Sequence, residues 1–370
     1  MRIFSKNIWL ILGLLSLFVR GILPISFIEK YYSRGFFLMI RESLDAFVPD
    51  IPFPPFFLFF LAVFIGILFC FRHFSKNFSF QRKAFYSLLS LANLVGFIIF
   101  SFMILWGFNY KRIAVEENLN LSTEPIELET LKAHLEDQTH IIAEMRKSLF
   151  RITDYSPESP VTSEHSPLWM EDLMRESLEG VLEKYDYPTN GRVNIRELTP
   201  NGILFRFNSS GIYLPFVGEG HIDAALHPLQ KPFVMAHEMA HGYGFGDEGT
   251  CNFWAYLACI HSKDLYVRYV GHLTYWRYLA SEWRRKKPEE YKEFRAELPQ
   301  GILVDLETIN DNLMKYPSFF PETRDFIYEL FLRSQGVDDG IENYNKIVPM
   351  VKSYWDKLKT ETKDETAKKQ

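Results

Sequence analysis

Cysteine is scarce in this chain, and its spacing argues against a cysteine-based zinc site or a disulfide. The 370 residues include only three cysteines, and no C-x-x-C occurs. Cys70 falls in an apolar run, whereas Cys251 and Cys259 fall on one predicted helix. Eight positions along a helix span about 12 Å, which is too far for a disulfide. All three are therefore interpreted as small apolar packing residues.

Nucleotide-binding motifs and a strong excess of positive charge are also missing. The sequence has no P-loop, no G-x-G-x-x-G and no internal repeat, and its formal net charge is −5. Its one dense basic cluster, residues 284–287, is interpreted as a solvated helix end rather than a nucleic-acid contact. We therefore expect no nucleic-acid partner.

What the chain does contain is the pentapeptide HEMAH at residues 237–241, an H-E-x-x-H motif. On a helix, His237 and His241 lie one turn apart on one face, so both imidazoles can reach one ion, with Glu238 beside them. This layout is typical of zinc hydrolases, in which the metal lowers the pKa of a bound water to roughly 7 and the glutamate takes its proton. Two histidines one turn apart could also belong to an ordinary helix face on which Glu238 forms a salt bridge between them. However, the preceding residues 231–236 are apolar, which predicts a buried helix and one Zn²⁺ per chain.

A third protein ligand is expected, and two neighbouring acids compete for the role. Asp247 takes the last position of the metzincin spacing H-E-x-x-H-x-x-G-x-x-H, with Gly244 allowing a sharp turn. Glu248 opens a second predicted helix, on which it shares a face with Asn252 and Tyr256. This second arrangement is that of the gluzincins and favours Glu248, with Asp247 as a helix N-cap or a contact to a ligand.

Several other polar residues are candidates for orienting a ligand or stabilising a developing oxyanion. Histidines in turns are more often surface or packing residues, and packing is the default for any one of the 19 tyrosines. The candidates are Asn252, Glu219, His221, His227, Tyr256, Tyr269 and Tyr275.

The run PFVMAHEMAHGYGFGDEGTCNFWAYLAC, together with the hydrophobic amino-terminal third and the stretch FLRSQG at residues 331–336, resembles a known family. It is similar to the bacterial (Bacteroidetes-type) membrane proteins grouped as domain of unknown function 3810, and the resemblance covers most of the chain. Members of that family pair transmembrane segments with a zincin-like H-E-x-x-H domain. Their pattern has a Glu at the position of Glu248 and an Asn at that of Asn252, which implies Glu248 as the third ligand.

Three apolar runs in residues 1–108 predict a helical membrane anchor. They cover residues 8–28, 53–71 and 85–106, each near the roughly 20 residues that a spanning helix needs. Residues 72–83 between the second and third runs hold Arg72, Lys76, Arg82 and Lys83 without an acidic residue, which predicts a cytoplasmic connection. Three spans then place everything after Trp106 on the outer side. Lys111 and Arg112, just beyond the third run, are basic residues that favour the opposite orientation.

The rest of the chain predicts a mainly helical α+β domain over residues 109–356. Four short strands, at residues 193–198, 203–207, 212–214 and 221–224, suggest a small antiparallel sheet just before the HEMAH helix. Such a sheet offers an edge strand for an extended peptide. The charged residues 357–370 are expected to be disordered.

These observations predict a multi-pass protein of the inner membrane, with an extracytoplasmic zincin-like metallopeptidase domain that acts on a peptide or protein. A second hypothesis belongs to another class: a zinc-binding sensor or envelope assembly protein that does not cleave its partner. The two differ in whether bound metal is accompanied by turnover that Glu238→Gln abolishes. The sequence does not predict the oligomeric state.

Overall fold

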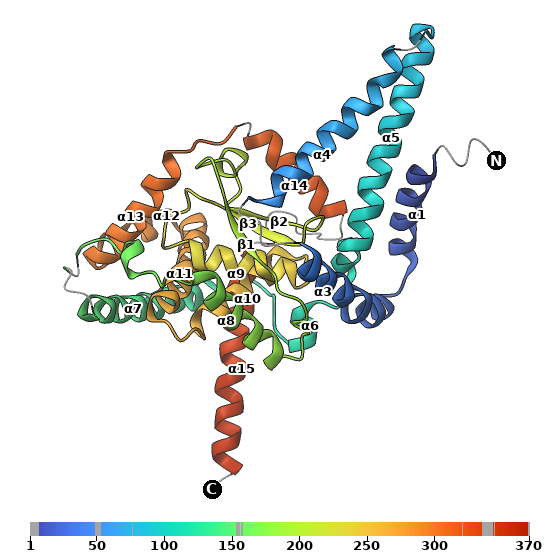
Figure 1. Cartoon of the computed structure of the whole chain (residues 1–370). Coiled ribbons are helices and arrows are strands. Elements are labelled where there is room, and N and C mark those ends of the chain that lie inside the picture. Colours follow the sequence, from blue (N-terminus) through green and yellow to red (C-terminus); the bar gives the residue numbers. More distant parts are fainter. Residues whose placement is uncertain are drawn as a thin grey trace. The chain divides into compact units, whose positions relative to one another are not determined.

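The computed structural model describes residues 7–48, 53–75, 77–152, 156, 158–319, 321–334, 343 and 345–368 (Figure 1). The chain divides into two compact units. Unit 1 contains Met1–Ile113, Asn190–Val193 and Leu214–Glu219, and unit 2 contains the remainder. The main boundary lies at Ile113, five residues after the boundary predicted at residue 108. The two short segments 190–193 and 214–219, which join unit 1 from far along the chain, are not predicted by the sequence.

Unit 1 is built from apolar helices. Helix α1 crosses α5 closely because Gly13 and Gly96 face each other there, and a Cβ at position 13 would lie 2.6 Å from the carbonyl oxygen of Gly96. Phe216 joins this unit by stacking on Phe59 with ring centroids 4.4 Å apart. The elements are α1 (Ile8–Ile22), α2 (Ile25–Phe27), the π-helix η2 (Ile28–Phe36), α3 (Phe37–Phe47), α4 (Pro55–Cys70), η3 (Phe71–Ser75), α5 (Phe80–Leu105) and η4 (Gly107–Lys111).

One described helix, α5, is long and apolar enough to cross a membrane, and a second candidate exists if the bent pair α1 and Ile25–Phe47 is counted as one span. The three predicted spans are therefore not confirmed. The first breaks at Leu23 and Pro24, where the backbone is extended and the helices bend by 111°, because Pro24 forces the preceding residue out of the helical region. The second is shorter than predicted, because α4 begins only at Pro55 and has 16 residues.

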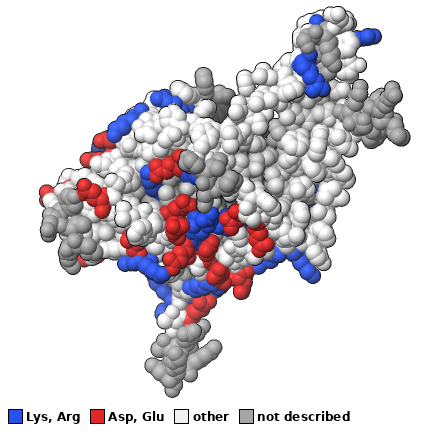
Figure 2. Space-filling model, in the orientation of Figure 1, with Lys and Arg blue, Asp and Glu red and all other residues white. Residues whose placement is uncertain are grey.

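The surface of α4 and α5 is apolar over most of its length. Figure 2 shows few charged side chains on this face, with Lys and Arg gathered at the end where the two helices are joined. Arg72 lies in η3 of that connection, and Arg82 and Lys83 lie in the first turn of α5, whereas Lys76 lies outside the described residues. Large side chains such as Phe64, Phe69 and Leu88 are more than half exposed. Such a surface is typical of contact with lipid.

Unit 2 is mainly helical and is packed around α10. All thirteen residues of α10 are buried, with α8, α9 and α11 packed against it. A helix that is enclosed on every side can carry polar groups only where they have partners. The helices are α6 (Val115–Leu119), α7 (Leu128–Ile152), η5 (Ser163–His165), α8 (Met170–Lys184), η6 (Phe205–Phe207), α9 (Lys231–Gly242), α10 (Glu248–Ile260), α11 (Leu265–Lys286), α12 (Pro288–Ala296), α13 (Gln300–Met314), α14 (Pro321–Ser334) and α15 (Ile347–Lys368).

The small sheet before α9 is present, but it is not wholly antiparallel as predicted. Its strands β1 (Ile195–Leu198), β2 (Gly211–Leu214) and β3 (Glu219–Asp223) lie in the order β1-β3-β2. Strand β1 runs parallel to β3, with Ile195 opposite Gly220 and Leu198 opposite Asp223. The parallel pair arises because the long connection after β1 returns the chain to the same end of the sheet.

The predicted strand at residues 203–207 is wrong. This segment forms turns and the short helix η6 instead. The buried carboxylate of Asp223 accepts backbone N–H groups of Gly202 and Leu204 at 2.7 Å, and that of Phe205 at 3.3 Å. A chain whose successive N–H groups converge on one carboxylate cannot be extended, because successive N–H groups of a strand point in opposite directions.

The tail differs from its prediction as well, because α15 continues as a helix to Lys368. Its first half is anchored by buried Ile347, Val348 and Val351. The charged residues that follow are good helix formers, so the helix propagates from this anchored start instead of ending at residue 356.

Candidate metal centre

Two consecutive helices of unit 2 present the motif residues. Helix α9 begins at Lys231 with Pro232 in its first turn, and it carries His237, Glu238 and His241. The chain then reverses at Gly244, whose φ of +87° is costly for any residue with a side chain. Helix α10 begins four residues later at Glu248, so the end of one helix and the start of the next bring their side chains together.

His237, His241 and Glu248 form a compact group of three donor atoms. The Nε2 atoms of the two histidines are 3.1 Å apart. Glu248 Oε2 lies 3.1 Å from Nε2 of His237 and 3.5 Å from Nε2 of His241. Tetrahedral zinc with ligand bonds of about 2.1 Å needs donor atoms about 3.4 Å apart, so the triangle fits the size of that ion.

The outer ring nitrogens of both histidines have acceptors. His241 Nδ1 lies 2.8 Å from the carbonyl oxygen of Phe245, which can only accept a hydrogen bond, so Nδ1 carries the proton. His237 Nδ1 lies 2.9 Å from Oδ1 of Asn252. Each ring therefore turns Nε2 toward the centre of the triangle, where its lone pair is available to a metal once the ring is neutral. This is the tautomer that a metal ligand requires.

The electrostatics of the three groups are strongly coupled. Burial alone would raise the pKa of Glu248, but the contacts with His241 and His237 hold that pKa well below its usual range. Burial would lower the pKa of His241, but Cys251 and Glu248 raise it well above its ordinary value. Each charge in this buried group is compensated by its neighbours. A carboxylate and two imidazoles are also a donor set that suits a divalent cation.

Glu238 lies beside this triangle and is almost fully buried. Burial raises the pKa of its carboxyl group, and the backbone N–H of Tyr213 in β2 donates a hydrogen bond to it. Strand β2 approaches so closely that a Cβ at Gly211 would lie 2.5 Å from Oε1 of Glu238. The glycine at position 211 therefore makes room for the carboxylate.

Asp247 and Asn252 have different roles from those of the donor triangle. Asp247 is the N-cap of α10, and its Oδ1 accepts the N–H of Thr250 at 2.7 Å. Its other oxygen accepts from Asn343 Nδ2 at 2.7 Å. Asn252 was predicted to lie on the face of Glu248 one turn along, and it does, but the residue that it contacts is His237.

The tyrosines proposed from sequence do not reach the site. Tyr256 accepts a hydrogen bond from Trp355, Tyr269 donates to Asp305 at 2.6 Å, and Tyr275 lies against the carbonyl of Val348. All three hydroxyl groups are engaged in packing contacts away from the donor triangle.

The remaining candidates predicted from the sequence also have other surroundings in the structure. His221 is buried in the central strand β3 with its ring bonded to the backbone of Ile212, and burial lowers its pKa to about 4. His227 accepts the N–H of Leu229 in the turn before α9. Glu219, a candidate for orienting a ligand histidine, is buried at the start of β3, and the Nδ1 atoms of His237 and His241 contact Asn252 and the carbonyl of Phe245 instead.

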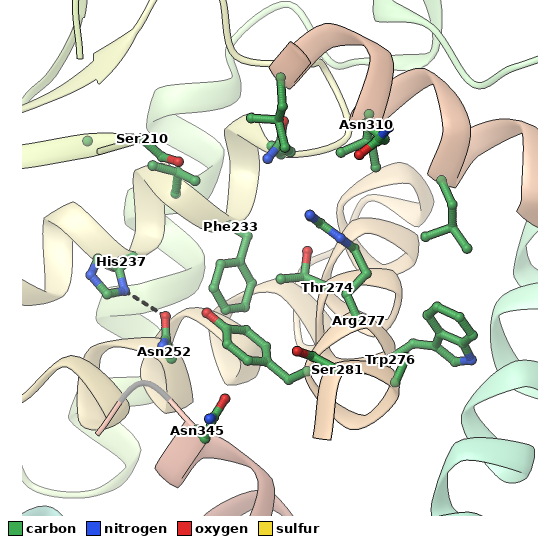
Figure 3. A pocket seen from close by; sticks show the side chains of 18 of the residues that line it. Ser210, Phe233, His237, Asn252, Thr274, Trp276, Arg277, Ser281, Asn310 and Asn345 are labelled. Carbon is green, nitrogen blue, oxygen red and sulfur yellow. Dashed lines mark hydrogen bonds between the residues drawn. The ribbon is translucent and has the colours of Figure 1, made fainter. Parts of the chain in front are cut away.

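A cavity of about 840 Å³ opens beside the triangle and is lined by His237, Glu238 and Asn252 on one side. In Figure 3, Phe233 and Thr274 line the same cavity, and Arg277 extends into it from α11. Tyr278, the next residue, lines it too and is hydrogen-bonded to the side chain of Asn252. Arg277 and Tyr278 were not predicted from the sequence. The available signal was the polar stripe Thr274, Arg277, Tyr278 and Ser281 at helical spacing on an otherwise buried helix.

Comparison with known proteins places the chain in a family. The sequence model described as "Protein of unknown function (DUF3810)" matches residues 32–351. The chain belongs to this family. No curated protein and no solved structure matches it. The match to the DUF3810 family includes α9, α10 and α11, and therefore every residue of the donor triangle.

Proposed function

We propose that the chain is a membrane-anchored zinc-dependent peptidase. The observation that carries the proposal is the triangle of His237, His241 and Glu248, in which both histidines have the tautomer that leaves Nε2 facing the other donors. Glu238 stands beside the triangle and opens onto the same cavity. These residues would hold one Zn²⁺, which when bound supplies a Lewis acid and an activated water.

Glu238 is the proposed proton carrier of the reaction. Its buried carboxyl group has a raised pKa, which suits a group that first accepts a proton from the attacking water and then gives it to the leaving amine. The hydrogen bond from the N–H of Tyr213 and the close approach of Gly211 hold this carboxylate in one position. A fixed base is more effective than a mobile one, because the orientation is already present before reaction.

Tyr278 is the proposed donor to the oxyanion. Asn252 uses Oδ1 to accept from His237, so its amide nitrogen is the group that donates to the phenol oxygen of Tyr278. The phenol proton is then left to point into the cavity. Burial raises the pKa of Tyr278, which keeps the phenol protonated at neutral pH and able to donate.

A peptide is the favoured substrate because a strand edge lies beside the site. Strand β2 is at the edge of the sheet, and Ser210 and Gly211 line the cavity. An extended peptide can pair with such an edge through its backbone, which brings one peptide bond past Glu238.

For the membrane region, we propose that α1, α4 and α5 cross the inner membrane and that the basic segment 72–83, which runs from η3 into the first turn of α5, is cytoplasmic. The basic residues that oppose this orientation have partners inside unit 1. Lys111 donates to the carbonyl oxygen of Gly21 at 2.8 Å, and Arg112 pairs with Glu29 at 3.2 Å. The ion pair with Glu29 offsets the charge of Arg112, which leaves Lys111 as the one uncompensated charge of the two against the four basic residues of 72–83, and unit 2 would face the outside.

The proposal is tested by metal content and turnover in one pair of proteins. Full-length wild type and Glu238→Gln are purified in detergent, and zinc is measured by elemental analysis. We expect about one zinc per chain in both. Peptide-library cleavage is expected in wild type and to fall at least 100-fold in the variant, in line with the loss of a general base. Equal cleavage by both proteins would refute the role of Glu238, and zinc-free wild type would refute the metal site.

A further inference from the structure

The cavity beside the donor triangle is basic. Three arginines line it: Arg277 and Arg284 from α11, and Arg295 from α12. Among the described residues that line it, Glu238 is the one carboxylate, and the proposed function assigns it to proton transfer. The far wall is apolar, with Leu306, Ile309 and Leu313 from α13. A cavity of this composition favours an anionic group attached to an apolar or neutral chain.

Arg277 precedes Tyr278, and it differs from two buried arginines of the same unit, Arg146 and Arg175, which pair with carboxylates. Arg146 is bound to Asp305 at 2.8 Å, and Arg175 to Asp172 at 2.7 Å. Arg277 is half-buried, and no ion pair or hydrogen bond joins it to any part of the chain that the structure describes. A partly enclosed guanidinium is costly unless an anion reaches it, and its planar fork fits a carboxylate.

The spacing of the arginines matches an extended peptide. Thr274, Arg277, Tyr278, Ser281 and Arg284 all line the cavity, and they recur at helical spacing along one face of α11. Arg277 and Arg284 are seven residues apart, which is about 10 Å along the helix. An extended peptide advances about 3.3 Å per residue, so the two arginines span about three of its residues.

We propose that this cavity recognises a carboxylate of the substrate, and that Arg277 binds it within a few residues of the bond that Glu238 addresses. The inference rests on the proposed peptidase function and adds the substrate class, which is a peptide segment bearing a carboxylate. That carboxylate comes either from the chain terminus or from an acidic side chain. Arg284 and Arg295 attract the same charge from farther along the cavity.

The test measures binding with four probes and the full-length Glu238→Gln protein, which cannot cleave them if the proposed function holds. Dansyl-Ala-Gln-Phe-Ala carries either a free carboxylate or an amide at its end, and dansyl-Ala-Glu-Phe-Ala amide and dansyl-Ala-Asp-Phe-Ala amide carry an acidic side chain. We expect at least one carboxylate probe to bind tenfold or more tightly than the neutral amide. The free-acid probe and the two acidic-side-chain probes separate the two sources of the carboxylate.

Matched arginine variants decide whether the cavity is responsible. Arg277→Gln should lower the affinity of the preferred probe at least tenfold and leave that of the neutral amide unchanged. Arg285→Gln removes the same charge from the neighbouring position of α11, which does not line the cavity, and should have no effect. The proposal is overturned if the neutral amide binds as well as the others, if no probe binds, or if the two variants behave alike. Zinc content and cleavage are measured separately, so a failed carboxylate preference leaves the test of the peptidase function intact.

Discussion

Asp247 and Glu248 are adjacent acidic residues with different roles at the start of α10, one as the N-cap and the other as a member of the donor triangle. Asp247 has an extended backbone and accepts the N–H of Thr250, as an N-cap does. Glu248 is the first helical residue, so its side chain turns toward His237 and His241. A shift of the helix start by one residue would exchange the two roles.

This contrast predicts different losses in two single variants. Glu248→Ala should remove most of the zinc, because it deletes one of three protein donors. Asp247→Ala should retain zinc and lower the free energy of unfolding by about 1 kcal/mol, the usual value of an N-cap side chain. Elemental analysis and urea unfolding of both proteins measure these effects. Zinc loss confined to Asp247→Ala would place the third ligand at 247.

At the residue scale, the sequence predicts what depends on local spacing. His237 and His241 lie one turn apart on α9, and Asn252 lies one turn beyond Glu248 on α10, as helical geometry requires. Tyr278 and Arg277 could not be placed in this way, because their position depends on how α11 packs against α10. Nothing in the spacing of 19 tyrosines distinguishes Tyr278, which contacts Asn252 in the cavity, from the others.

Among the elements, strand β2 has the most direct effect on chemistry, because its backbone touches the carboxylate of Glu238. Gly211→Ala would place a methyl group 2.5 Å from Oε1 of Glu238, so one of the two must move. We expect turnover to fall at least tenfold while zinc content stays near one per chain, since the metal donors lie on other elements. Turnover and elemental analysis on the same preparation provide the measurement.

Gly180→Ala is the matched control for that substitution. Gly180 lies on α8, and nothing lies within 4 Å of the position that its Cβ would take. An alanine there should raise the free energy of unfolding by about 0.5–1 kcal/mol, because glycine is costly inside a helix, and should leave turnover unchanged. Equal turnover losses in the two variants would indicate that any added methyl group disturbs the fold.

The contact between α7 and α11 predicts a dependence of stability on pH. His272 on α11 is buried against Gln138 on α7, and burial lowers its pKa to about 4 from an ordinary value of 6.5. The folded protein therefore holds this proton less tightly than the unfolded chain. Stability is fully present above pH 6.5 and falls as the pH drops toward 4, by about 2 kcal/mol between pH 7 and pH 5.

Replacing the histidine should remove that loss. His272→Gln is expected to unfold with a smaller difference in free energy between pH 7 and pH 5 than wild type, measured by urea unfolding at both values. His140→Gln, which changes an exposed histidine on α7, is the matched control. A wild-type pH dependence in His272→Gln would show that another group carries the effect.

At the element scale, helices are predicted well because their periodicity is local, and the sheet is predicted less well. The strand expected at residues 203–207 has a strand-like sequence, but Asp223, more than fifteen residues away, gathers its N–H groups into turns. The orientation of β1 relative to β3 also depends on the path of the intervening connection. Neither the turns at residues 203–207 nor the orientation of β1 can be predicted from the residues of those segments alone.

For the whole molecule, topology decides which peptides the proposed site could meet. If the basic segment 72–83 is cytoplasmic, an external protease acting on spheroplasts should digest unit 2 and leave a protected fragment of unit 1. Immunoblots with antibodies to each end provide the measurement, and a cytoplasmic protein serves as the control for intact membranes. Digestion of unit 2 only after lysis would place the site in the cytoplasm.

The division of the chain into an apolar amino-terminal third and a more polar remainder could be predicted from composition, because long apolar runs dominate residues 8–106. Their exact lengths could not. The break at Leu23 and Pro24 and the start of α4 at Pro55 depend on where proline ends or begins a helix within a continuous apolar run.

The unequal lengths of α4 and α5 also bear on the lipid around the protein. Helix α4 has 16 residues and is about 24 Å long, whereas the apolar part of α5, residues 84–105 after the charged first turn, is about 33 Å long. If both helices cross the membrane as proposed, a hydrocarbon layer of about 30 Å is too thick for α4 and close to the apolar length of α5. The hydrophobic mismatch at α4 would be relieved by thinning the bilayer next to it. The anchor would therefore enrich short-chain lipids around itself and partition into the thinner regions of its membrane.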